Sequence, residues 1–216
     1  AAGLKENSNY NTISQSTMVS NTVGYAALFI NASSNTILQS LVQGSTAAFV
    51  SGSTGTVIVG SVFIATNGSG AGLVLADGSV NLTVTTSTFQ GGALGAGITM
   101  LPGNAGLISL TSNTVSGGRY GLSAAAMACG ACVGNLSISS LTLSGPLAAG
   151  ATAIHFMGGT FTSTFTQVGF YDANIGANVN ASLLSGASRI SMKASAGSYA
   201  GPAYENDPAG LVDWEG

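Results

Sequence analysis

The most recognisable reactive spacing in the chain belongs to its two cysteines. Cys129 and Cys132 are separated by two residues, as in redox pairs and in half of a zinc site. A structural zinc site needs four ligands, and the sequence has no second cysteine pair. A thioredoxin-like pair would open a helix after a βαβ strand, whereas this pair lies in a long segment between expected strands. We therefore expect a loop-closing disulfide, with a free or redox-active pair as the alternative.

Charged side chains that could act as acids or bases are almost missing from the body of the chain. Between residues 7 and 188 they are Asp77, Arg119 and Asp172. The two aspartates are separated by about four of the 24-residue repeats described below, which is too far for the carboxylate pair that glycoside hydrolysis needs. We expect Asp77, which precedes a glycine, to hydrogen-bond a turn backbone. Arg119 is expected to be a solvated corner residue, with docking of a sugar or a partner's carboxylate as the alternative.

The single histidine, His155, has no partner for catalysis. It alternates with Ile154 and Phe156, and no second histidine or nearby carboxylate could complete a metal site or a triad. We expect an outward-facing or hydrogen-bonded strand histidine. The glycine-rich run at residues 68–72 lacks the glycine and helix of a dinucleotide loop and the Lys-Ser/Thr of a P-loop. The sequence therefore predicts no enzyme, no catalytic residue, no metal and no cofactor.

The composition excludes several further classes. The 216 residues include 4 Lys+Arg and 7 Asp+Glu, so 5% are charged, while 45% are hydrophobic and 32 are glycine. Four basic residues cannot neutralise a run of phosphates, which argues against nucleic acid as a partner. No uninterrupted apolar stretch approaches the roughly 20 residues that span a bilayer, so we expect no membrane span. What remains is one β domain with a polar, nearly uncharged surface.

Short apolar runs framed by small residues recur along the chain. Their central residues lie 21, 24, 25, 24 and 32 positions apart, and they are Leu28, Phe49, Leu73, Ile98, Leu122 and Ile154. A second family of strands alternates apolar and small polar residues with nearly the same period, at Ile13, Ile37, Val57, Leu82, Leu107, Leu136, Phe161 and Ile190. A third apolar position follows some five to eight residues later, at Val19, Val62, Phe89, Val115, Leu143 and Val168.

Three short strands and three glycine-rich corners in about 24 residues describe one coil of a parallel β-solenoid. No repeat has room for the helix that a βαβ alternation requires. We expect about seven or eight coils. The predicted division is an N-terminal lead-in at residues 1–9, a solenoid domain at 10–196 and an extended C-terminal tail at 197–216.

Some of these repeats resemble a known fold family. The openings at residues 34–37 (Ser-Asn-Thr-Ile) and 112–115 (Ser-Asn-Thr-Val), and the strand at 72–75 (Gly-Leu-Val-Leu), are similar to the right-handed parallel β-helix of pectate-lyase-like solenoids. They are especially similar to the repeats of large secreted bacterial surface proteins, over about residues 10 to 190. The resemblance implies an all-β right-handed parallel β-helix and an extracellular or cell-surface location. The acidic clusters and closely spaced aspartates of the family's lyases and hydrolases have no match in this sequence.

The start of the sequence fits the same location. Ala1 and Ala2 suit the new end that a signal peptidase leaves, with a fragment boundary as the alternative.

Most of the charge lies near the two ends. Lys5 and Glu6 lie at the start, and six further charged residues lie beyond residue 188. We expect these ends to be an assembly interface, because an uncapped solenoid end presents unpaired strands and open core. The C-terminal residues assigned to this interface are Tyr199, Tyr204, Leu211, Val212 and Trp214. The leading hypothesis is a structural subunit that stacks end to end with copies of itself into an extracellular filament or surface layer, its tail adding to the next subunit.

Two other functions remain as alternatives. An adhesin or glycan-binding module would use exposed aromatic side chains, for which Tyr10, Tyr25, Tyr120 and Tyr171 are candidates. Ice or mineral-surface binding by threonine rows ranks lower, because the outward threonine does not recur in every coil. A polysaccharide lyase ranks last. Five Asn-X-Ser/Thr matches make glycosylation a further expectation, although asparagine ladders also explain them.

Overall fold

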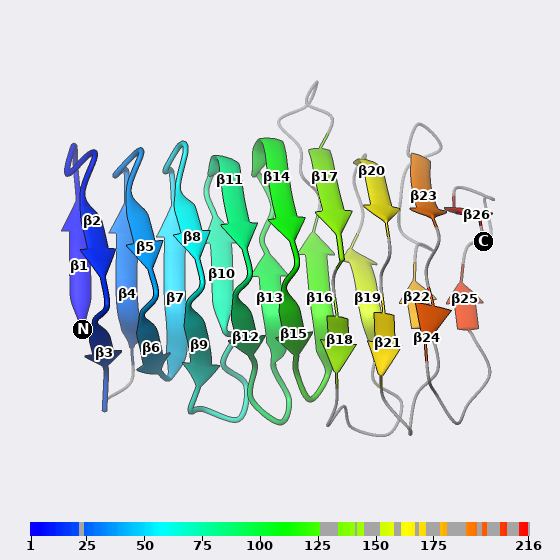
Figure 1. Cartoon of the computed structure of the whole chain (residues 1–216), viewed down its shortest axis with the longest axis horizontal. Coiled ribbons are helices and arrows are strands. Elements are labelled where there is room, and N and C mark those ends of the chain that lie inside the picture. Colours follow the sequence, from blue (N-terminus) through cyan, green and yellow to red (C-terminus); the bar gives the residue numbers. More distant parts are fainter. Residues whose placement is uncertain are drawn as a thin grey trace.

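The fold is given by a computed structural model. It describes residues 1–21, 24–125, 134–140, 142–144, 152–157, 161–166, 169–171, 178–180, 189–193, 196–197, 204–206 and 212–215. Throughout these ranges the regular structure is β-strand, and no helix occurs in them. The strands lie side by side along the long axis of the molecule, from the N-terminus at one end to the C-terminus at the other (Figure 1).

Each turn of the chain contributes one strand to each of three sheets, except the last, whose described strands belong to the first and second sheets only. The first sheet has the order β1 (Ala2–Lys5), β4 (Tyr25–Ile30), β7 (Thr46–Ser51), β10 (Leu73–Ala76), β13 (Ala96–Met100), β16 (Tyr120–Ala125), β19 (Thr152–Met157), β22 (Asn178–Asn180) and β25 (Tyr204–Asn206). The second has the order β2 (Thr12–Ser14), β5 (Thr36–Leu38), β8 (Val57–Val59), β11 (Val80–Thr85), β14 (Ala105–Thr111), β17 (Gly134–Ser139), β20 (Phe161–Thr166), β23 (Arg189–Lys193) and β26 (Val212–Glu215).

The third sheet completes the turn. Its strands are β3 (Thr17–Val19), β6 (Leu41–Gly44), β9 (Val62–Ala65), β12 (Thr88–Gln90), β15 (Thr114–Ser116), β18 (Thr142–Ser144), β21 (Gly169–Tyr171) and β24 (Ala196–Gly197). Neighbouring strands pair in parallel, as β10 does with both β7 and β13. The predicted all-β parallel β-solenoid is therefore confirmed.

The core is a set of apolar ladders, one or two for each sheet. In the first sheet the inward position passes from Ala48 to Leu73, Ile98 and Leu122 in consecutive turns, all buried. In the third sheet Phe63 and Phe89 are fully buried, and their rings stack with centroids 4.8 Å apart. Burying each such side chain contributes roughly 1.5–3 kcal/mol.

Some of the predicted apolar positions lie on the wrong face. The sequence aligned Phe49 with Leu73, but Phe49 pairs with Val74. Leu28 and Phe49 of that predicted series therefore lie on the outer face of the first sheet, whereas Leu73 and the residues after it lie on the inner face. Likewise Val19 and Val62 are 40% and 38% exposed, and the buried neighbours Met18 and Phe63 fill the core in their place. The reason is the two-residue period of a strand, in which a slip of one residue moves a side chain to the other face.

One corner of the solenoid bends through a single left-handed residue in each turn. This corner joins the second sheet to the third, and the φ values of its residues lie between 46° and 57°: Gln15, Gln39, Gly60, Thr86, Ser112 and Ser140. Only one of them is glycine, although φ in this region strains a residue that carries a Cβ. Backbone hydrogen bonds to the next turn hold Gln15, Gln39 and Thr86 there, as Gln39 N donates to Val59 O at 2.9 Å.

A buried polar ladder runs beside that corner. The backbone N–H of Ser40 donates to Ser61 Oγ at 3.1 Å, that of Ser61 to Ser87 Oγ at 3.2 Å, and that of Ser87 to Asn113 Oδ1 at 2.8 Å. These four side chains are at most 4% exposed. The ladder supplies acceptors to N–H groups that leave the strand register at the bend, which avoids the cost of burying them unpaired.

Both predicted terminal segments contain strands of the solenoid. Residues 1–9, expected as a lead-in, include β1, which pairs with β4 and packs Ala2 and Leu4 against the core. Residues 197–216, expected as an extended tail, include β25 and β26, which pair with β22 and β23. The reason is that backbone groups next to an open sheet edge gain hydrogen bonds by pairing with it. The sheet edges therefore extend beyond residues 10 and 196.

A search of the described residues for a helix long and apolar enough to cross a membrane found none.

Candidate functional site

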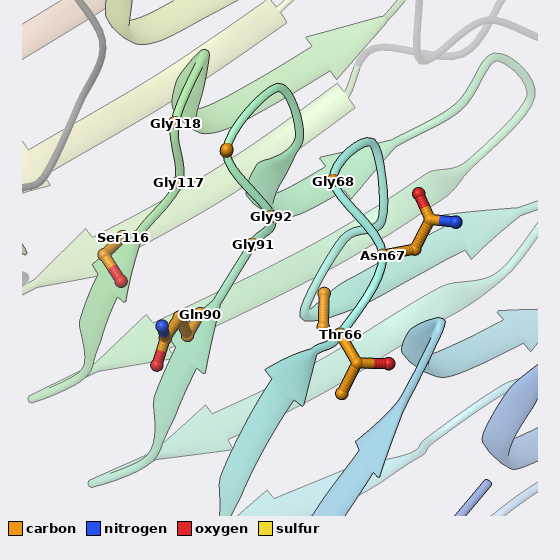
Figure 2. Close-up of a pocket in the computed structure, with 11 residues that line it drawn as sticks. Thr66, Asn67, Gly68, Gln90, Gly91, Gly92, Ser116, Gly117 and Gly118 are labelled. Carbon is orange, nitrogen blue, oxygen red and sulfur yellow. The ribbon is translucent and has the colours of Figure 1, made fainter. Parts of the chain in front are cut away.

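An uncharged hollow opens on the side of the solenoid where three loops stack. The loops follow β9, β12 and β15 in consecutive turns, and the hollow between them has a volume of about 390 Å³ (Figure 2). It is lined by Ala65, Thr66, Asn67, Gly68, Gln90, Gly91, Gly92, Ala93, Ser116, Gly117 and Gly118. This volume falls in the range of about 300–1,000 Å³ that is usual for small-molecule sites.

Glycine lets these loops stack closely. A Cβ atom added to Gly92 would clash with the carbonyl oxygen of Asn67, and one added to Gly118 would clash with that of Ala93. The loops are also joined by backbone hydrogen bonds, from Gly92 N to Gly70 O and from Gly118 N to Gly92 O, both at 2.9 Å. The walls of the hollow are therefore mostly backbone, held in place by neighbouring turns.

Three neutral side chains at the hollow have unused hydrogen-bonding groups. Thr66, Gln90 and Ser116 form no side-chain hydrogen bond with any residue that the structure describes, and Thr66 and Gln90 are exposed. Asn67 is partly used, because its Oδ1 accepts from the backbone N and the Oγ of Ser69, both at 3.0 Å. The hollow can therefore donate and accept hydrogen bonds without presenting a charge.

A second cluster lies on the outer face of the first sheet and contains the single histidine. The rings of His155 and Tyr120 stack with centroids 4.6 Å apart, and the Arg119 guanidinium lies 5.1 Å from the Tyr120 ring centre. Burial, and secondly the positive charge of Arg119, lowers the pKa of His155 from its ordinary value of 6.5. Its Nδ1 atom is buried without a hydrogen-bond partner among the described residues. These contacts describe a packed cation–aromatic stack.

The predicted structural role of Asp77 takes a specific form. Its carboxylate accepts a hydrogen bond from Ser51 Oγ at 2.9 Å, one turn away, and its own φ is 50°. The partner is thus a side chain of the neighbouring turn, where a turn backbone was expected. In the described part of the chain, no three His, Cys, Asp or Glu side chains lie close enough together to hold a metal ion.

The residues predicted to form an assembly interface are only partly described. Lys5 ends β1 and Glu6 follows it at the first corner, and both side chains are exposed. Tyr204 lies in β25, and Val212 and Trp214 lie in β26. In backbone register Trp214 pairs with Met192, which pairs with Phe165. Tyr199, Leu211 and the expected disulfide of Cys129 and Cys132 lie outside the described residues, as does Asp172.

The tyrosines proposed for glycan binding are not brought together on one face. Tyr10 is 83% exposed at a corner, where its φ is 60°. Tyr25 lies on the first sheet and contacts the Phe49 ring at 4.7 Å. Tyr120 is stacked on His155, and Tyr171 belongs to β21 of the third sheet. A continuous aromatic platform is therefore not formed by the described side chains.

Two rows of hydroxyl residues follow the second sheet in backbone register, and the described side chains among them, those of Thr83, Ser109, Thr85 and Thr111, lie on its outer face. Register places Ser/Thr residues opposite one another in successive turns: Thr83, Ser109, Ser137, Thr164 and Ser191 in one row, and Thr85, Thr111, Ser139 and Thr166 in the other. Towards the N-terminal end the rows meet Val57 and Val59. As expected, threonine by itself does not recur in every turn of these rows. Serine occupies the intervening positions, so a hydroxyl residue does recur.

Sequence reasoning did not find the hollow. Its signal is present in the two glycine pairs, Gly91-Gly92 and Gly117-Gly118, which recur 26 residues apart and belong to the glycine-rich corners expected from the sequence. What the sequence could not give is the stacking of the loops, which places Gln90 and Ser116 in neighbouring turns.

The comparisons add no relative to this description. No family model matches the chain, and neither a curated protein nor a solved structure does.

Proposed function

We propose that this chain is a structural β-solenoid subunit that stacks end to end with copies of itself. The observation that carries the proposal is the first turn, where β1, β2 and β3 each have a sheet partner on one side only among the described strands. Apolar residues of that turn, Ala2, Leu4 and Ile13, pack on the core yet remain partly exposed. An unpaired strand edge beside open apolar core favours the addition of another strand layer.

The edge of β1 supplies free backbone groups for this contact. Glu6 N donates to Ile30 O of the neighbouring turn at 3.0 Å. Because successive N–H groups of a strand point to alternate sides, those of Gly3 and Lys5 point away from β4. A second copy can add a strand here by backbone hydrogen bonds, and nothing in this geometry requires the C-terminal tail to be exchanged, since β25 and β26 pair within the chain.

A proline at Gly3 tests the proposal. Gly3→Pro removes one outward N–H while leaving the bonds to β4 in place, as proline does on edge strands. Gly3→Ser is the matched control, because it keeps the N–H and a Cβ there meets no atom within 4 Å. We expect concentration-dependent rods from wild type and Gly3→Ser by negative-stain microscopy and sedimentation, and monomers from Gly3→Pro. Wild type that stays monomeric at high concentration, or equal polymerisation of both variants, would refute the proposal.

A regular-surface-binding function is the second candidate, and the hydroxyl rows favour it. Residues that follow one another within a row lie about 4.8 Å apart, which is the spacing between neighbouring strands. The two rows lie about 6.6 Å apart, which is the length of two residues along a strand. This regular spacing suits a neutral ordered surface such as ice or a mineral. Thr83→Lys should abolish inhibition of ice recrystallisation if this candidate is right, whereas Thr114→Lys on the third sheet should not. No inhibition by wild type would eliminate it for ice.

We also propose an extracellular or cell-surface location and a non-catalytic role. The location is supported by the resemblance to pectate-lyase-like solenoids of secreted bacterial surface proteins, and the role by the structural use of Asp77 and His155. Protease treatment of intact source cells tests the location, because only a surface protein would be digested. A glycosylation proposal rests on exposed acceptor sites such as Asn31 and Asn67, and intact-mass measurement of the native protein tests it.

A further inference from the structure

We propose that the hollow between the loops is a binding site for a neutral saccharide, with Gln90 and Ser116 as its main hydrogen-bonding side chains. This goes beyond end-to-end assembly, because the hollow lies on the side of the solenoid at the loops after β9, β12 and β15 (Figure 2). The two proposals use different surfaces, so either can fail without the other.

The charge of the lining selects the class of ligand. None of the lining residues is ionisable. A metal ion would find no carboxylate there, and a phosphate or sugar acid would find no ammonium or guanidinium within the lining. The nearest cation in sequence is Arg119, whose guanidinium lies over the Tyr120 ring. The ligand that fits is therefore polar and uncharged.

The available groups suit the hydroxyls of a sugar. Gln90 offers two N–H donors and an acceptor oxygen, while the hydroxyls of Ser116 and Thr66 both donate and accept. Sugar hydroxyls also do both, so each can be satisfied by such a set. Gln90 and Ser116 lie opposite each other in register on β12 and β15, and Thr66 follows directly after β9, so the three come from consecutive turns. A few polar groups fixed in a concave site are what orients a small ligand.

The site is formed before any ligand arrives. The close stacking of Gly92 and Gly118 on neighbouring loops leaves little freedom for loop movement. A preorganised site loses less entropy on binding, which favours even a small ligand. The volume of about 390 Å³ suits one or two sugar rings.

The test measures binding of neutral sugars to matched variants. Maltose, cellobiose and N,N′-diacetylchitobiose are titrated into ¹⁵N-labelled protein and followed by NMR, with digalacturonate as an anionic comparison. Gln43→Ala is the control for Gln90→Ala, because Gln43 lies on the same outer row of the third sheet two turns earlier, outside the hollow. Ser116→Ala is a second variant that removes only a hydroxyl.

We expect saturable shifts of the Gly91, Gly92, Gly117 and Gly118 amides with at least one neutral sugar. Gln90→Ala and Ser116→Ala should each weaken Kd about tenfold, and Gln43→Ala should leave it unchanged. The proposal is overturned if no neutral sugar shifts these amides, if only digalacturonate does, or if the variants bind as wild type does. Because the readout is made on dilute protein, it is independent of whether the subunits assemble.

Discussion

Replacing Asn113 tests the buried polar ladder most directly. Asn113 is 1% exposed, its Oδ1 accepts from Ser87 N at 2.8 Å, and its Nδ2 donates to Val84 O at 3.0 Å. In Asn113→Ala the buried N–H of Ser87 has no acceptor, which costs about 1–3 kcal/mol, and loss of the second bond adds about 0.5–1.5 kcal/mol. We therefore expect Asn113→Ala to lower the free energy of unfolding by about 1.5–4.5 kcal/mol.

The ladder itself supplies a rescuing substitution. Earlier turns have serine at the equivalent position, where Ser61 and Ser87 accept backbone N–H groups at 3.1 and 3.2 Å. Asn113→Ser should restore an acceptor for Ser87 N and lose only the bond to Val84, a cost of about 0.5–1.5 kcal/mol. Thr114→Ala, at the next residue and the first of β15, should change stability by less than about 0.5 kcal/mol.

Urea unfolding at 25 °C measures these differences, and hydrogen exchange locates them. Because a solenoid's stability is a sum over turns and their interfaces, a local defect should accelerate exchange of the Ser87 amide more than that of distant turns. Equal destabilisation by Asn113→Ala and Asn113→Ser would show that the N–H acceptor is not what matters. A loss below 0.5 kcal/mol in Asn113→Ala would refute the ladder argument altogether.

Three further predictions follow from single residues. Thr86 has a φ of 49°, and Gly60 occupies the same corner position with a φ of 57°. In urea unfolding Thr86→Gly should therefore raise the free energy of unfolding by about 0.5–1 kcal/mol, and Gly60→Ala should lower it by about 1–2 kcal/mol. Changes of the opposite sign would contradict backbone strain at this corner. Burial and Arg119 lower the pKa of His155 below 6.5, so the unfolded chain binds the proton more tightly. The contribution of neutral His155 to the free energy of unfolding is therefore fully present above pH 6.5 and is lost as the pH falls below that value. His155 supplies the only imidazole NMR signal, whose midpoint should lie below 6.5 and rise in Arg119→Gln, and an unmoved midpoint would contradict the coupling. Thr56 Oγ1 is buried without a partner among the described residues, so Thr56→Val should match or exceed wild-type stability, and a loss above about 1 kcal/mol would indicate a hydrogen bond at that hydroxyl.

The repeat period was predictable because each turn must bury an apolar face of three short strands. That constraint leaves a period near 24 residues, and pairs such as Leu28 with Phe49 were aligned correctly from sequence. The face of a given residue was less predictable. Val62 and Phe63 are adjacent and both apolar, and only packing decides that Phe63 is buried.

The candidate sites divide in the same way. That His155 is the single histidine was evident from composition, whereas its stacking on Tyr120 and the nearby positive charge of Arg119 came from the structure. The hollow was not evident, because Gln90 and Ser116 are ordinary surface residues until the loops of consecutive turns are stacked beside them.

The sequence by itself determined the architecture of this protein: a repeated, nearly uncharged chain with short alternating strands can bury its apolar residues only by coiling on itself. The tertiary structure decided the register, and with it the functional surfaces. Register sets which residues of different turns lie side by side, about 4.8 Å apart along the solenoid. A shift of one residue would move each outward hydroxyl and amide to the inner face. Properties that depend on neighbouring turns, including the hydroxyl rows, the polar ladder and the hollow, are therefore determined only when the strands pair.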